Sequence, residues 1–216
     1  MQTVQINNGI NVEDNINEVL NNTDVYKTIC IISRDDLQNN REDKIINIVE
    51  NYYDTSHDEK SEKMQCGRVW FLIKKHRDEK KEFLQVGQAI DFEWNNTKGF
   101  FGEIKKHINE MFDKREYDSK ERGYLYNNYA KGLLEKSHEG DELIFCELYI
   151  EKYLENYAPN GYKEDIYMMA REYYAEASLA YFTQAKDWKF YNSGMDKRAI
   201  YHIVENNNAQ NIKEQR

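Results

Sequence analysis

Apolar residues near the N-terminus follow first a helical and then a strand-like spacing. In residues 12–22, Ile16, Val19 and Leu20 recur at intervals of three or one, which places them on one side of a short amphipathic helix. Residues 25–33, VYKTICIIS, are rich in β-branched side chains and short enough to predict a strand. The chain is therefore expected to open with a helix and a strand.

A polar stretch marks the first expected boundary between parts of the chain. Residues 40–53 carry several aliphatic side chains, and residues 52–63, YYDTSHDEKSEK, are polar enough to be interpreted as a loop or linker. We therefore expect residues 1–60 to form an N-terminal αβ extension.

Two apolar runs in the middle of the chain predict an antiparallel hairpin. GRVWFLIKK (67–75) and EFLQVGQAI (82–90) are separated by the charged segment HRDEKK, which suits a solvated turn. Residues 100–112, FFGEIKKHINEMF, carry their apolar side chains on one side and predict a short amphipathic helix. The order of elements to this point is β, β, α.

In the second half of the chain, the sequence pattern predicts elements for some segments only. Residues 113–140 have a mixed pattern that assigns no element. DELIFCELYI (141–150) is a continuous apolar run typical of a buried strand, and helical patterns cover residues 151–157 and 165–186. Residues 206–216 are polar and predict a flexible tail.

These elements together predict an α+β fold: a small mixed or antiparallel sheet with a hairpin core, flanked by helices. The expected organisation is residues 1–60 as the extension, residues 61–205 as the main domain, and residues 206–216 as the tail.

Composition indicates a globular protein. The chain has 216 residues, 40% of them hydrophobic and 13% aromatic, which suffices for a core despite 32% charged residues. Three cysteines without metal-ligand spacing indicate neither a disulfide framework nor a zinc site. The first residues show no basic and apolar signal regions, and no run approaches 18 apolar residues. We expect a cytoplasmic protein without a membrane segment.

Charge limits the partners. The net charge is −9, and the field of an acidic protein repels a phosphate backbone. This charge disfavours a general DNA coat, although a local basic cleft on an acidic molecule is compatible with it.

Three short motifs resemble the core of the GIY-YIG nuclease family. GRVWFLI stands where that family has its GIY strand, and LQVGQA stands where it has YIG followed by Gln or a small polar residue. GEIKKHI stands where it has a helix with Arg-x-x-x-His, and DELIFCELYI, Glu176 and Asn192 fill the places of a later strand, a glutamate and an asparagine. The resemblance covers residues 66–200.

The resemblance implies a metal-dependent DNA endonuclease. Glu176 would hold one Mg²⁺, His107 would lie near the phosphate, and Asn192 would maintain the geometry. Such a site works by neutralising charge and by metal-assisted activation of water.

The chain departs from the family at its catalytic positions. The first motif tyrosine falls on Val69 or Trp70, the second on Gln85, and the motif arginine on Glu103. None of these side chains is a phenol, and Glu103 reverses the charge where a phosphate-binding cation is expected. If the alignment holds, the usual mechanism is impaired.

Other residues could replace the missing groups. Lys105 or Lys106 would supply a substitute cation for substrate binding, and Tyr124 or Tyr126 a substitute phenol. The simpler interpretations are that Glu176 is a solvated glutamate at a helix edge and that His107 is a half-buried packing residue. The remaining histidines have no metal-binding spacing and are expected at the surface: His57, His76, His138 and His202.

Two functions follow. The first is a divergent DNA endonuclease of restriction or mobile-element type. The second is a catalytically inactive binding protein derived from that family, for example a phage or mobile-element factor that blocks a basic nucleic-acid-handling protein through its acidic, tyrosine-rich surface. For either function we also consider a homodimer. No motif indicates nucleotide-dependent chemistry.

Overall fold

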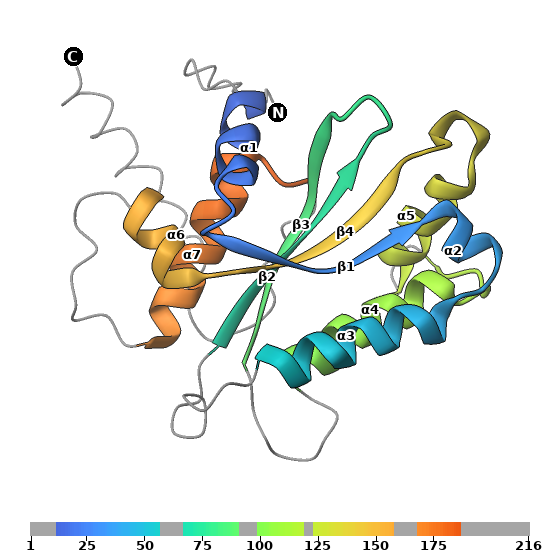
Figure 1. The fold of residues 1–216 in the computed structure, drawn as a ribbon, viewed down its shortest axis with the longest axis horizontal. Coiled ribbons are helices and arrows are strands. Elements are labelled where there is room, and N and C mark those ends of the chain that lie inside the picture. The colour runs from blue at the N-terminus through green and yellow to red at the C-terminus, as the bar shows by residue number, and fades with distance from the viewer. Residues whose placement is uncertain (1–11, 57–66, 91–98, 119–122, 158–167, 187–216) are drawn as a thin grey trace.

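The computed structural model describes residues 12–56, 67–90, 99–118, 123–157 and 168–186. These residues form a four-stranded sheet with helices on both of its faces (Figure 1). The predicted α+β class, with a hairpin core flanked by helices, is confirmed.

The sheet is antiparallel throughout. Its order is β1 (Tyr26–Ser33), β4 (Glu142–Leu148), β2 (Gly67–Lys75) and β3 (Lys81–Ile90). Strands β2 and β3 form the expected hairpin, and β2 also pairs with β4. Strand β4 lies between β1 and β2, and its side chains from Leu143 to Leu148 are buried, as its continuous apolar sequence predicts.

The N-terminal segment belongs to the same sheet as the hairpin. Strand β1 pairs with β4 along its length, from Tyr26 opposite Leu148 to Ser33 opposite Glu142. The boundaries expected at residues 60/61 and 205/206 lie outside the described residues.

Helices α1, α6 and α7 cover one face of the sheet (Figure 1). They span Val12–Asn21, Ile150–Tyr157 and Met168–Thr183. Alternate side chains of β2, among them Val69 and Phe71, pack into the core beneath these helices.

Helices α2, α3, α4 and α5 cover the opposite face. They span Arg34–Gln38, Glu42–Ser56, Phe100–Phe112 and Tyr124–Leu134, and a 3₁₀ turn follows at Lys136–His138. Trp70 and Leu72 of β2 pack into this second core, together with Phe100 and Ile104 of α4. Successive side chains of β2 thus point to opposite faces of the sheet and pack against different layers of helices.

One expectation needs correction. The loop expected from residue 52 begins later, because α3 continues to Ser56. Buried Tyr52 holds this last part of the helix: its hydroxyl donates to Glu147 on β4, 2.8 Å away, and its ring packs near Phe101. Residues 113–140, which no pattern assigned, contain α5 and the 3₁₀ turn.

Within the described part of the chain, no helix has the length and apolar character needed to cross a membrane.

The close approach of β2 and β3 gives a first prediction. A Cβ atom at Gly87 would lie 2.6 Å from Cζ2 of Trp70, whereas one at Gly132 on α5 would meet nothing within 4 Å. We expect Gly87→Ala to lower the free energy of unfolding by about 1–3 kcal/mol through overpacking. The matched variant Gly132→Ala should raise it by up to about 1 kcal/mol through helix propensity.

Urea unfolding of both variants measures these changes. Equal midpoints for Gly87→Ala and the wild type would contradict the packing of Trp70 on β3.

Candidate functional site

His107 is buried on the sheet side of α4 and packs against two aromatic rings. Only 9% of it is exposed. Its ring stacks on Tyr126 of α5, with centroids 3.8 Å apart and planes inclined by 16°, and lies 5.2 Å from the Trp70 ring. These contacts fit the interpretation of His107 as a packing residue, and its role near a phosphate stays a prediction.

Two carboxylates flank the His107 ring. Oε2 of Glu110 lies 3.3 Å from Nδ1, and Oε1 of Glu103 lies 3.4 Å from Nε2 without the alignment of a hydrogen bond. Burial, followed by the charges of Glu103 and Glu110, raises the pKa of Tyr126 well above its ordinary value. The surroundings of His107 are therefore anionic.

The positions that the resemblance assigns to the two motif strands and the motif helix lie close together. Trp70, opposite Gly87 in the hairpin, reaches His107, which lies one turn after Glu103 on α4. Gln85 is opposite Leu72, and its side chain lies near the Tyr126 hydroxyl without the geometry of a hydrogen bond. Val69, the alternative to Trp70, packs into the core on the other face. We call Trp70, Gln85, Glu103, His107, Glu110 and Tyr126 the α4 cluster.

Four atoms of the α4 cluster are buried and have no hydrogen-bond partner among the residues that the structure describes. They are Trp70 Nε1, Gln85 Oε1, His107 Nε2 and the Tyr126 hydroxyl. Most buried polar atoms in proteins are paired, so four such atoms in one place indicate a polar environment that is not fully satisfied. Because two of its members are carboxylates, the cluster suits a cation or a neutral hydrogen-bonding group and disfavours a phosphate.

The candidate substrate-binding residues are placed differently. Tyr126 belongs to the α4 cluster, and Tyr124 is half-buried at the start of α5. Lys105 forms an ion pair with Glu50 of α3, and Nζ of Lys106 lies 3.9 Å from Glu110. Both lysines are therefore close to carboxylates.

Glu176 lies on α7, on the opposite face of the sheet from His107. It is 3% exposed, so its interpretation as a solvated residue at a helix edge is wrong. Helix α7 packs on β2 and β3, and its buried face also includes Glu172, one turn earlier. The structure does not bring Glu176 and His107 together, and Asn192 lies outside the described residues.

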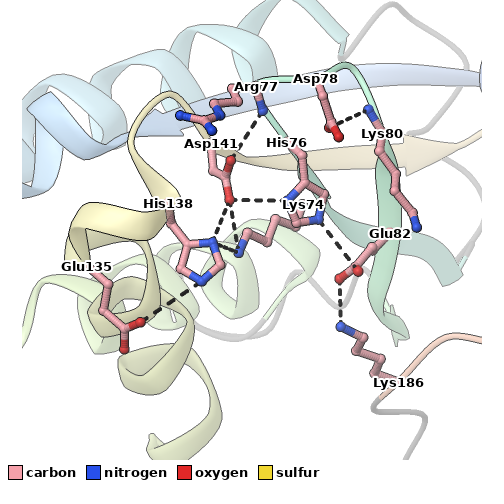
Figure 2. A network of polar contacts seen from close by, with 10 residues as sticks. All are labelled: Lys74, His76, Arg77, Asp78, Lys80, Glu82, Glu135, His138, Asp141 and Lys186. Atoms are coloured by element: carbon pink, nitrogen blue, oxygen red, sulfur yellow. Dashed lines mark hydrogen bonds and ion pairs between the residues drawn. The ribbon is translucent and has the colours of Figure 1, made fainter.

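A second group of polar residues lies at the tip of the β2–β3 hairpin (Figure 2). Lys75 is opposite Glu142 in the pairing of β2 with β4, so His76 and Asp141 lie next to the ends of paired strands. Asp141 is 4% exposed, and its Oδ2 lies 3.2 Å from Nδ1 of His76 and 2.9 Å from Nδ1 of His138. We call His76, His138 and Asp141 the hairpin-tip triad.

Cationic and polar neighbours compensate the buried Asp141 carboxylate. Burial alone would raise its pKa, but Lys74, the backbone amide of Arg77 and His138 together lower it. Nζ of Lys74 is 3.0 Å from Oδ2, and the Arg77 amide donates to Oδ1 across 3.2 Å. Asp141 is thus held as a carboxylate.

His57 and His202 lie outside the described residues, while His76 and His138 are partly buried in this network, with 21% and 34% of their side chains exposed. Their separation along the chain follows no metal-binding motif, and only the register of β2 against β4 brings them together. The one signal in the sequence was an aspartate immediately before a buried strand.

Comparison with known proteins gave no match. We compared the chain with family models, curated proteins and solved structures, and none of the three comparisons gave a match. The resemblance stated above therefore rests on its motifs alone.

Two buried tyrosines give a matched prediction. The Tyr52 hydroxyl donates to Glu147, whereas the Tyr126 hydroxyl has no hydrogen-bond partner within the described part of the chain. We expect Tyr52→Phe to lower the free energy of unfolding by about 1–3 kcal/mol, because Glu147 loses a buried donor. Tyr126→Phe should change it by less than about 0.5 kcal/mol or raise it, because it removes an unpaired polar atom.

Chemical denaturation of the two variants checks this difference. A loss for Tyr126→Phe as large as that for Tyr52→Phe would mean that the Tyr126 hydroxyl has a strong partner.

Proposed function

We propose that the protein is a catalytically inactive, GIY-YIG-derived binding protein whose partner is a basic, nucleic-acid-handling protein. The observation that carries this proposal is the α4 cluster: the positions that resemble the catalytic motifs lie together, and their chemistry is anionic.

The first argument is the chemistry of phosphodiester cleavage. Stabilising the developing charge on a phosphate requires cations or hydrogen-bond donors beside it. Glu103 stands at the position of the motif arginine and, with Glu110, flanks His107. Lys105 and Lys106, the proposed substitutes, lie next to Glu50 and Glu110.

The second argument is access. His107 and Tyr126 are buried by their mutual stacking and by Trp70, so the surface of α4 offers a DNA backbone neither group in the described geometry. Catalytic groups must lie within hydrogen-bond reach of the reacting atoms.

The third argument is long-range charge. A net charge of −9 repels DNA and accelerates association with a basic protein. Exposed carboxylates occur on α1 and α6, at Glu13, Asp14, Glu18, Glu151 and Glu155.

One observation favours the endonuclease as a second candidate. Glu172 and Glu176 are both buried on α7, and carboxylate oxygens are ligands that Mg²⁺ prefers. In that case Glu172 and Glu176 of α7 would hold the Mg²⁺ ion, which would activate a water. Tyr126 could not supply the phenol of such a site, because it lies on the other face of the sheet.

A cleavage assay separates the two functions. Labelled double-stranded and single-stranded DNA are incubated with Mg²⁺ or Mn²⁺ and with the wild type, Glu176→Gln or the exposed control Glu155→Gln. We expect no cleavage above buffer from any of the three proteins. Cleavage by the wild type and by Glu155→Gln that Glu176→Gln abolishes would overturn the proposal in favour of the endonuclease.

The proposed partner is identified by photo-crosslinking in the cell that naturally makes this protein, followed by purification of the captured protein. We expect a basic protein whose DNA affinity falls when this chain is added, with an effect that weakens as salt is raised. A partner that is acidic, or whose nucleic-acid binding is unchanged, would contradict the proposal.

A further inference from the structure

The hairpin-tip triad has the ligand types and the spacing of a metal site. It offers two imidazole nitrogens and one carboxylate oxygen, all within 4.8 Å of one another. In a tetrahedral zinc site, bonds of about 2.0–2.1 Å place neighbouring ligand atoms roughly 3.3 Å apart. The separations of 2.9 and 3.2 Å from Asp141 to the two histidines are close to this value.

His138 Nδ1 lies between an acceptor and a donor that make opposite demands on its protonation. This nitrogen lies 2.9 Å from Asp141 Oδ2, to which it donates in one tautomer, and 3.0 Å from the Lys74 ammonium, from which it accepts in the other. One ring nitrogen cannot do both. A metal ion would resolve the conflict, because it takes a lone pair from His138, from His76 and from Asp141.

Each histidine also has a carboxylate on its outer side. Nε2 of His76 lies 3.5 Å from Oε1 of Glu82, and Nε2 of His138 lies 4.0 Å from Oε2 of Glu135 (Figure 2). Metal-binding histidines commonly donate their second N–H to a carboxylate, which fixes the tautomer with a free Nδ1. His76 Nε2 is buried and has no hydrogen-bond partner among the described residues, so a small shift of Glu82 would complete this contact.

Lys74 explains how the triad is stable without a metal. Its ammonium lies 3.0 Å from both Asp141 and His138, and so places a positive charge beside the ligand atoms. The lysine side chain is long and flexible, and therefore can withdraw when a stronger cation arrives.

We propose that the hairpin-tip triad binds a divalent transition metal of the zinc class, in competition with the Lys74 ammonium. Two imidazoles and one carboxylate suit Zn²⁺ or Co²⁺ and not Mg²⁺, which prefers six oxygen ligands. The bound ion fastens the tip of the hairpin to the start of β4. This site is distinct from α7, and the inference does not depend on the proposed function.

Cobalt absorption provides the test, because tetrahedral Co²⁺ has a characteristic visible spectrum. The metal-free wild type is titrated with Co²⁺ and then with Zn²⁺ in competition. His138→Ala removes one ligand, Lys74→Met removes the competing ammonium, and Glu139→Gln alters an exposed neighbour outside the triad. Circular dichroism confirms that each variant is folded.

We expect saturable Co²⁺ binding by the wild type and displacement by Zn²⁺. Affinity should fall at least tenfold in His138→Ala, rise several-fold in Lys74→Met, and stay unchanged in Glu139→Gln. Absence of saturable binding by the wild type, or equal affinities of the wild type and His138→Ala, would overturn the site. An affinity of Lys74→Met no higher than that of the wild type would overturn the competition.

Discussion

The pairing of β4 on both of its edges is the constraint on which the rest of the structure depends. Strand β4 joins β1 from the N-terminal segment to the β2–β3 hairpin, and helices cover both of its faces. Its one buried charge, Glu147, is compensated by the Arg68 guanidinium at 3.3 Å and by the Tyr52 hydroxyl. Because a buried carboxylate is costly without such partners, these contacts also fix α3 against the end of the sheet.

The same strand determines where the polar groups gather. The start of β4 brings Asp141 to the hairpin tip, where two histidines and Lys74 surround it. Because successive side chains of β2 point to opposite faces of the sheet, Trp70 packs on the α4 side and Val69 on the α7 side. As a result the α4 cluster and the buried Glu176 lie on opposite faces of the sheet.

The sequence predicted the elements better than the sites. Helix α4 and the hairpin were identified because their apolar spacing is regular. Helix α5 was missed because its tyrosines, asparagines and Gly132 do not form a clear pattern of apolar and polar positions. The group of Trp70, Gln85, Glu103 and His107 could be anticipated as motif positions. The contact of His76 with His138 could not, because it depends on strand register, which no local pattern records.

Binding of DNA tests most directly the central proposal that the positions resembling the GIY-YIG motifs do not form a phosphate site. The anisotropy of a labelled DNA duplex is measured as the protein is added at low salt, where electrostatic binding is strongest. The acidic surface and the anionic α4 cluster predict no saturable change. Saturable binding that weakens steeply with added salt, and that is lost when Lys105 and Lys106 are replaced by alanine, would contradict the account.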